Sequence, residues 1–427
     1  MEIVTSTYLL PMTRGTPIIK QGALLTERGK ILQIGTKSDL QKQYPQAEIQ
    51  EFAECVIIPG LVNAHCHLDM LSYHEHLFAE RDVGETPLEF IDTLISSIDY
   101  REEITNEKAL VDMQRGASRL IETGVTCLGN CTQFEGAIKL LAEMGLRGIV
   151  YSEIIAGRGE VAQEKFEVAL ALTEKYSDAS NEHMRVGLAP AAPYLLSRNL
   201  LKIISQQARD LSLPIQMHVA ESFSEMEFFF DSQGAIANDL FPALGWRELP
   251  PAQRKTPTQY LADIGFFEAP VTIIGGLHLS ASDFPLLARH LARIVYCPTL
   301  NHVMKHGMLP LGKLVESGIP IGLGTGIWNT RLGFSLWDEM RLALKHGSQP
   351  LPTPEELLRM ATIGGARALG LDHLVGTLEK GKKADYVVVR MATKRENEKD
   401  LIAHLIQETE PQHILRVMCG EEILKAS

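Results

Sequence analysis

Short apolar segments alternate with amphipathic helical segments from about residue 59 to about residue 370, and this pattern constrains the fold more than any other feature. The apolar segments after the first are 125–128, 147–151, 185–189, 214–219, 271–275, 293–297 and 320–324. Alternation of strand and helix over such a length is typical of a parallel α/β architecture, with a barrel as the leading form. Active sites in such barrels lie at the carboxyl ends of the strands.

The two ends of the chain have a different pattern. Alternating apolar and polar residues occur at 3–10, 23–25 and 30–34, and β-type segments return at 384–389, 414–419 and 422–424. A period of two residues indicates strands whose successive side chains point to opposite faces. We therefore predict that both ends of the chain build one discontinuous β domain beside the barrel.

Composition excludes several classes of protein. The chain has 427 residues, 45% of them hydrophobic, and a net charge of -12 that comes from 53 acidic and 41 basic residues. This charge argues against a nucleic-acid-binding surface and against attraction to anionic membranes, and it favours a small neutral or cationic partner. The sequence shows neither a membrane-length apolar run nor an amino-terminal signal pattern, so we predict a cytoplasmic protein. Its six cysteines do not form a disulfide-framework pattern, and we expect buried thiols.

Histidines stand where two of the predicted strands end. The apolar run 57–62 leads to His65 and His67, whose side chains can point to the same side of a strand. Such a pair alone fits a structural role as well as half of a metal site. His218 ends the apolar segment 214–219, and Glu221 follows three residues later. Three imidazoles can hold zinc and leave one position open for water, while a nearby carboxylate such as Glu221 moves protons.

Four motifs in order carry a family resemblance. They are Pro-Gly-Leu-Val-Asn-Ala-His-Cys-His at 59–67, Met-His-Val-Ala-Glu at 217–221, Cys-Pro-Thr-Leu-Asn at 297–301 and Gly-Thr-Leu-Glu-Lys-Gly-Lys-Lys-Ala-Asp at 376–385. Together they resemble the amidohydrolase superfamily, and within it the chlorohydrolase and deaminase branch, which includes guanine, adenosylhomocysteine and aminodeoxyfutalosine deaminases. The resemblance extends over nearly the whole chain.

The resemblance implies a fold and a reaction. The fold is an α/β (β/α)8 TIM barrel at residues 59–370, which forms the metal-dependent hydrolase domain, with a small discontinuous β-sandwich domain at residues 1–58 and 371–427. The reaction is deaminase-like hydrolysis of a carbon–nitrogen bond in a heterocyclic amine, in which activated water attacks an sp² carbon and expels ammonia. His65, His67 and His218 would bind one divalent metal, zinc in the first place and iron as the alternative. Glu221 would transfer protons to a ring nitrogen of the substrate.

Three positions depart from the family pattern. Gly326 stands where the family has a metal-binding aspartate, Ala191 where it commonly has a substrate-facing histidine, and Gly275 where it ends its sixth strand with a histidine. Each replacement removes a polar group without supplying another. Two hypotheses follow: an active hydrolase in which another residue or the substrate fills the gap, and a catalytically inactive homologue that binds a metal, a ligand or another protein.

Several further residues are candidates for substrate binding. Asp69 could orient the substrate or fill the gap, or could hydrogen-bond its own loop, and His278 could also fill the gap. Tyr194 and Trp328 could line a purine-sized pocket or could pack in the core. Asn301, in the third motif, completes the predicted set. A second His-x-His pair, His74 and His76, follows no apolar strand, so we expect a solvated loop there. We take a homodimer as the default assembly.

Overall fold

A parallel barrel is the largest unit of the protein. The computed structural model describes residues 1–79, 89–155, 159–176, 183–326, 334–346, 351–392 and 400–426. The eight strands of the barrel follow one another in sequence order, and neighbouring strands are parallel. They are β6 (Leu61–Cys66), β7 (Val125–Thr132), β8 (Arg147–Ile154), β9 (Met184–Pro190), β10 (Ile215–Val219), β11 (Val271–Gly275), β12 (Arg293–Tyr296) and β13 (Ile321–Leu323). A parallel bridge between Cys66 and Gly326 joins the end of the last strand to the first. The predicted TIM barrel is therefore confirmed.

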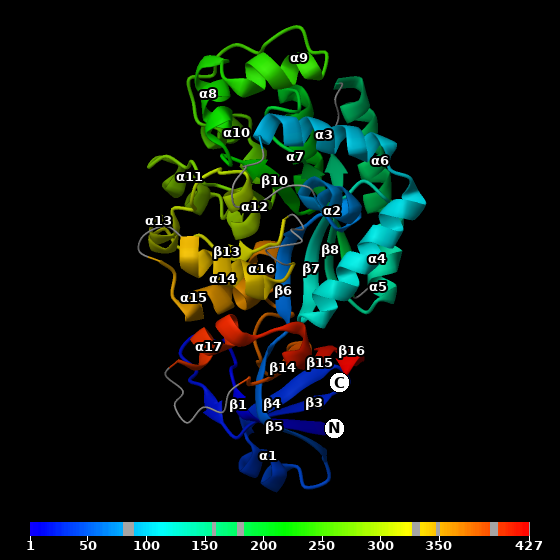
Figure 1. Ribbon diagram of the computed structural model, residues 1–427, viewed down its shortest axis with the longest axis vertical. Coiled ribbons are helices and arrows are strands. Elements are labelled where there is room, and N and C mark those ends of the chain that lie inside the picture. Colours follow the sequence, from blue (N-terminus) through cyan, green and yellow to red (C-terminus); the bar gives the residue numbers. More distant parts are fainter. Residues whose placement is uncertain are drawn as a thin grey trace.

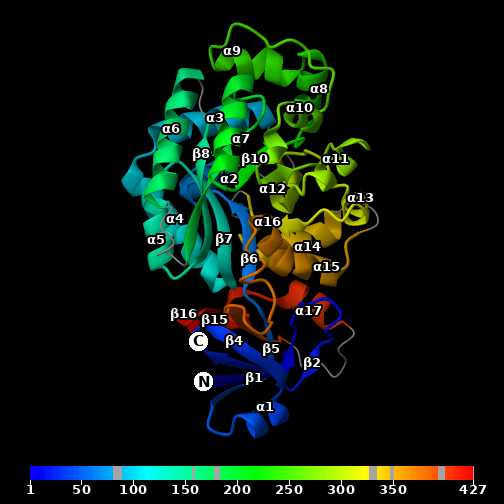
Figure 2. The same ribbon diagram turned by 180° about the vertical axis from the view of Figure 1, so that it is seen from behind.

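Helices surround this sheet (Figures 1 and 2). They are α2 (Leu71–Ala79), α3 (Phe90–Glu103), α4 (Asn106–Glu122), α5 (Gly136–Glu143), α6 (Gly159–Lys175), α7 (Arg198–Asp210), α8 (Phe223–Asp231), α9 (Phe241–Ala243), α10 (Pro257–Asp263), α11 (Asp283–Arg289), α12 (Pro298–Val303), α13 (Leu311–Glu316), α14 (Leu336–His346), α15 (Pro354–Arg359) and α16 (Gly365–Leu369). Their apolar faces pack against the sheet. In α7, for example, Leu200, Leu201 and Ile204 are buried, and Ser197 caps the amino-terminal end by accepting a hydrogen bond from the N–H of Leu200.

A second sheet combines both ends of the chain. It contains β1 (Glu2–Leu9), β2 (Ile19–Lys20), β3 (Gly22–Glu27), β4 (Lys30–Thr36), β5 (Glu48–Pro59), β14 (Tyr386–Arg390), β15 (Ile414–Cys419) and β16 (Glu422–Ala426). β14 pairs with β5, so the carboxyl-terminal strands continue the amino-terminal ones. Figure 1 shows this sheet at one end of the barrel, with α1 (Lys37–Gln43) beyond it and α17 (Leu401–Glu408) between the two units. The separate β unit from both termini is thus confirmed, while the limits at 58/59 and 370/371 stay predictions.

The apolar run that leads to His65 forms two strands, whereas the sequence suggested one. β5 ends at Pro59 in the terminal sheet, and β6 begins at Leu61 in the barrel. Gly60 makes the junction: a Cβ added there would lie 2.1 Å from the hydroxyl oxygen of Thr126. Only glycine lets the chain pass this close to β7. The terminal sheet therefore leads directly into the strand that carries the first histidines.

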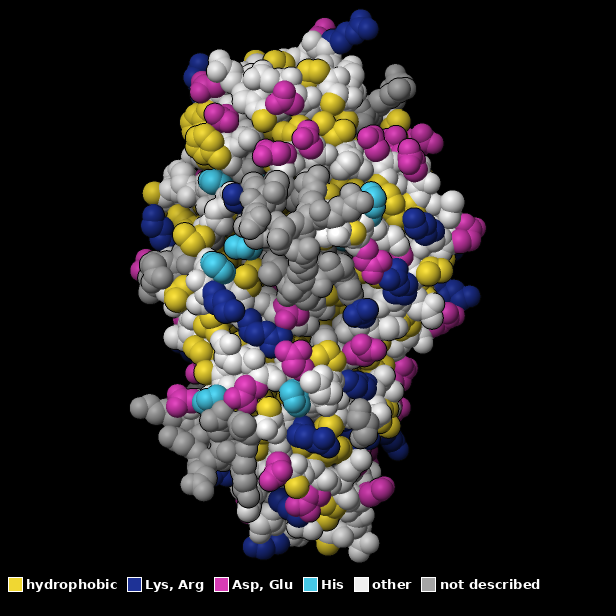
Figure 3. Space-filling model, viewed as in Figure 1, with side chains coloured by type: hydrophobic (Ala, Val, Ile, Leu, Met, Phe, Trp, Pro, Cys, Tyr) yellow, Lys and Arg dark blue, Asp and Glu magenta, His cyan; other side chains and the backbone are white. Residues whose placement is uncertain are grey.

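The buried thiols and the mixed surface charge are those of an ordinary globular protein. All six cysteines are free and buried, as expected. Acidic and basic side chains are interspersed over the face shown in Figure 3. In the part of the chain that the structure describes, no helix combines the length and the apolar character that crossing a membrane requires.

Candidate metal centre and active site

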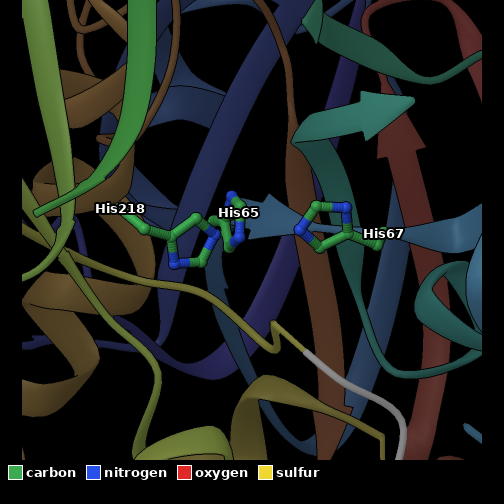
Figure 4. Close-up of side chains that lie close together, drawn as sticks. All are labelled: His65, His67 and His218. Carbon is green, nitrogen blue, oxygen red and sulfur yellow. The ribbon is translucent and has the colours of Figure 1, made fainter. Parts of the chain in front are cut away.

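Three histidine rings converge at the carboxyl ends of two barrel strands (Figure 4). His65 lies in β6, His67 directly follows that strand, and His218 lies near the end of β10. Each offers one nitrogen, and these nitrogens lie within 4.8 Å of one another. The ring centroid of His65 lies 4.8 Å from that of His67 and 5.1 Å from that of His218. The structure therefore brings together the three predicted metal ligands.

The orientation of His65 is set by Gln216. The side-chain N–H of Gln216 donates to the carbonyl oxygen of Ala64 at 2.8 Å, which leaves the amide oxygen facing Nδ1 of His65 at 3.0 Å. An amide oxygen only accepts, so Nδ1 carries the proton and Nε2 keeps its lone pair. That Nε2 atom is buried without a hydrogen-bond partner. Burial, assisted by the nearby charge of His218, lowers the pKa of His65 to about 3, so the ring is neutral and able to bind a metal.

His218 also has an oxygen acceptor at its Nδ1 atom, and this acceptor is the carboxylate of Glu221. Nδ1 of His218 lies 2.9 Å from Oε2 of Glu221. Burial acts to lower the pKa of His218, but the charge and hydrogen bond of Glu221 outweigh it and raise that pKa. The pKa of Glu221 is lowered because His218 outweighs the effect of burial. The second carboxylate oxygen of Glu221, Oε1, is buried and unpartnered, and is therefore available to a ligand.

His67 faces a buried ion pair. Nε of Arg101, on α3, donates to Oε2 of Glu153, at the end of β8, over 2.7 Å. Nδ1 of His67 lies 3.4 Å from Nη2 of Arg101 and 3.6 Å from Oε1 of Glu153. Burial, together with the charges of His65 and Arg101, holds the pKa of His67 well below its usual value. His67 is thus also a neutral imidazole.

These residues fit a divalent metal ion. Two of the three rings have an oxygen acceptor at Nδ1, and the third has a carboxylate close to that atom, so each ring can present Nε2 to a common point. Metal-binding histidines are commonly held by outer acceptors of this kind. The buried, unpartnered Nε2 of His65 is the observation that calls for a partner. Three imidazoles leave a coordination position open, as catalytic zinc sites require, and His218 releases its Nε2 proton when a metal binds.

A cavity opens onto the histidines. Its described lining includes Glu221, Tyr194, Ala191 and Gly326, and both apolar and polar side chains from several helices complete its walls. Tyr194 is thus among the residues that line the cavity, and its role in substrate binding stays a prediction. Burial raises the pKa of Tyr194 well above its usual value, so its hydroxyl is protonated. A mostly apolar cavity with a few convergent polar groups is typical of a small-molecule site.

Other predicted residues lie outside the described lining of this cavity. Asp69 is buried and accepts a hydrogen bond from the hydroxyl of Thr132 at 2.7 Å. Nε2 of His278 contacts the backbone oxygen of His306 at 2.7 Å. Asn301 is buried on α12. Trp328 lies outside the described residues. Their predicted roles in substrate binding stay predictions.

Four charged or imidazole side chains of the lining were not predicted from the sequence: Arg101, Glu153, His74 and His306. Glu153 follows the predicted strand at 147–151, and this position at a strand end is a signal for a site residue. His74 was expected in a solvated loop, which was wrong: it lies on α2 and is buried. No pattern singled out His306, which follows α12. Its ring packs edge-on against Phe90, and both of its nitrogens are buried without a partner.

The positions that lost polar groups have distinct geometries. Gly275 has a φ of +96°, and a Cβ there would lie 2.9 Å from Cβ of Glu221. Gly326 has a φ of +57°, and a Cβ there would lie 3.3 Å from Cβ of Cys297. Ala191 lines the cavity. The structure therefore leaves little room for a side chain at Gly275 and more at Gly326.

The fold and this site can be compared with known proteins. The model of the Amidohydrolase family matches residues 56–424. A 5-methylthioadenosine/S-adenosylhomocysteine deaminase from Desulfitobacterium hafniense is 27% identical over 395 residues, covering 91% of this chain and 84% of the relative. A 5'-deoxyadenosine deaminase from Methanococcus maripaludis is 28% identical, covering 87% and 83%.

Solved structures show the same fold. The aminofutalosine deaminase of Helicobacter pylori has a TM-score of 0.84 at 22% identity and covers 99% of each chain. An adenosine deaminase from Xanthomonas campestris, solved with bound zinc, has a TM-score of 0.83 at 20% identity and covers 99% of this chain and 92% of its own.

Proposed function

Because this chain belongs to the amidohydrolase family, we propose that it is a metal-dependent hydrolase that deaminates a heterocyclic amine. The observation that carries this proposal is the convergence of His65, His67 and His218 beside Glu221 at the carboxyl ends of the barrel strands. A divalent ion held by the three imidazoles, which we propose to be zinc, would supply Lewis acidity that makes water a stronger nucleophile.

Glu221 is the proposed proton carrier. Its Oε2 atom is held by His218, and its Oε1 atom is unpartnered, so a proton can be taken up and released at Oε1 while Oε2 keeps its hydrogen bond to His218. Water adds to the ring carbon that bears the amino group, and one of its protons passes through Glu221 to the adjacent ring nitrogen. The carbon–nitrogen bond then breaks and ammonia leaves with the remaining proton, so a carbonyl replaces the amine.

His306 is the proposed substitute for the polar groups missing at Ala191, Gly275 and Gly326. Its ring lines the same cavity, and burial lowers its pKa, so it is a neutral imidazole with one donor and one acceptor. An unpaired buried polar atom costs about 1–3 kcal/mol. A polar substrate atom that reaches either nitrogen would remove part of that cost.

The relatives suggest the class of substrate. Their names specify adenosine derivatives, and we propose that an aminopurine nucleoside is the substrate here. Cytoplasmic location and a homodimeric assembly stay predictions from the sequence.

Ammonia release tests the proposal. Zinc-loaded protein is assayed with adenosine, 5'-deoxyadenosine, 5-methylthioadenosine, S-adenosylhomocysteine and guanine, with Glu221→Gln as the matched inactive variant. We expect release from at least one nucleoside by the parent and a loss of about 10²–10⁴-fold in the variant. If nucleosides raise the melting temperature and no ammonia appears with zinc or iron, the protein is a ligand-binding homologue. The polar groups absent at Gly326, Gly275 and Ala191 favour this second candidate.

A further inference from the structure

We propose that Glu153, held by Arg101, is a positioning residue that makes His67 a metal ligand. When Nε2 of an imidazole binds a metal, Nδ1 carries the proton and needs an acceptor. Gln216 provides this acceptor for His65, and Glu221 provides it for His218. Glu153 is the acceptor that the structure offers to His67.

Arg101 fixes the position of Glu153 from two sides. Its Nε donates to Oε2 at 2.7 Å and its Nη2 to Oε1 at 3.4 Å, while its Nη1 donates to the backbone oxygen of Ser97 at 3.1 Å. The backbone oxygen of Arg101 also accepts from the side chain of Gln133. The Arg101 and Glu153 side chains are 8% and 6% exposed, so both are shielded from water. A forked contact of this type holds both partners in one orientation.

The contacts of His67 define a competition between two tautomers. An N–H of Arg101 faces Nδ1 at 3.4 Å, and a guanidinium can only donate. That contact favours the tautomer with the proton on Nε2, in which Nε2 has no lone pair to offer to a metal. Oε1 of Glu153 lies 3.6 Å from the same atom and can only accept, so it favours the tautomer that binds. A shift of a few tenths of an ångström brings Glu153 into hydrogen-bond range and completes the ligand set.

This inference rests on metal binding in the proposed function and is independent of hydrolysis. In Glu153→Gln, the single amide oxygen stays with Arg101 and the amide N–H₂ faces His67, where it favours the wrong tautomer. We expect zinc affinity, measured by competition with a chromogenic chelator, to fall about 10–100-fold. Glu339→Gln is the matched control, because Glu339 is equally buried and contacts the N–H of Thr299, and its zinc affinity should equal that of the parent.

Three further measurements separate positioning from a merely structural role. The unfolding temperature of metal-free Glu153→Gln reports the fold, and Glu153→Asp, which keeps the charge, should lose less affinity than Glu153→Gln. Imidazole ¹⁵N spectra of the zinc-loaded parent should show His67 with a protonated Nδ1 and a metal-bound Nε2.

Three results would overturn the proposed role of Glu153. Parent affinity in a folded Glu153→Gln variant would overturn it, and so would zinc bound through Nδ1 of His67 or a parent that binds no zinc. Absence of ammonia release together with the expected zinc affinities would refute only the hydrolase function.

Discussion

A carboxylate introduced at position 326 tests whether the missing aspartate limits the chemistry of this site. Gly326 lines the cavity, and its N–H donates to the backbone oxygen of His65 at 3.0 Å. The side chain of Gly326→Asp would therefore start beside a metal ligand. The variant should bind zinc more tightly than the parent and should deaminate the same substrate faster.

The structure sets the cost of this change. Gly326 has a φ of +57°, a conformation in which aspartate is among the better tolerated non-glycine residues, at about 1–2 kcal/mol. The added Cβ would lie 3.3 Å from Cβ of Cys297, so that side chain must move by a few tenths of an ångström. A cost of this size lowers the melting temperature by roughly 2–8 °C. A positioned base typically contributes about 10²–10⁴-fold in rate, so the folded variant should still be the faster enzyme.

Gly275→His is the matched contrast. At this position φ is +96° and the Cβ would lie 2.9 Å from Cβ of Glu221, so the new ring displaces the proposed proton carrier. This variant should lose more stability and gain no activity. Melting curves, zinc titrations and ammonia release are measured for both variants. If Gly326→Asp folds, binds zinc no better and releases ammonia no faster than the parent, the reasoning from the missing carboxylate is wrong.

Stability, catalysis and metal binding can each be perturbed at a further position. Burial raises the pKa of Glu339 to about 8, above its ordinary value of 4.5, so stability should fall as pH rises between these values, by at most roughly 4–5 kcal/mol. Urea unfolding at pH 5 and pH 9 should show a smaller change in Glu339→Gln. His306→Phe should lower the kcat of deamination at least 10-fold without releasing zinc. His302→Gln, at an exposed position on the same segment, should match the parent. Equal kcat values for the two variants would exclude His306 from the site. Removal of zinc by a chelator should lower the melting temperature of the parent by several degrees, since an ion at 100 times its dissociation constant adds about 2.7 kcal/mol to the free energy of unfolding. The melting temperature of His65→Ala should not change when the chelator is added.

The barrel and its histidines were predictable because each depends on local periodicity. Parallel strands are buried on both faces, so they read as continuous apolar runs, and the carboxyl end of such a run marks where a side chain can enter the site. His65, His67 and His218 meet that criterion, and the structure brings them together.

The partners of these histidines were less predictable, because they come from elements distant in sequence. Arg101 lies in the last turn of α3, where an arginine ordinarily reads as a solvated residue, and only the tertiary fold places it against Glu153. His306 follows α12 and has no periodic signal. The two-strand nature of the run 57–66 was missed because Gly60 interrupts it without a change in apolar character.

The charges around the cavity bear on the substrate. Among the described lining residues, the charged side chains form two balanced pairs, Arg101 with Glu153 and His218 with Glu221. The remaining lining histidines have lowered pKa values and are neutral at pH 7: His65, His67, His74 and His306. The protein carries a net charge of -12, but these lining groups sum to zero, and a bound dication makes the cavity positive. A cationic amine is then repelled from the site, so a neutral aminopurine fits better than the cationic partner that net charge alone also allowed.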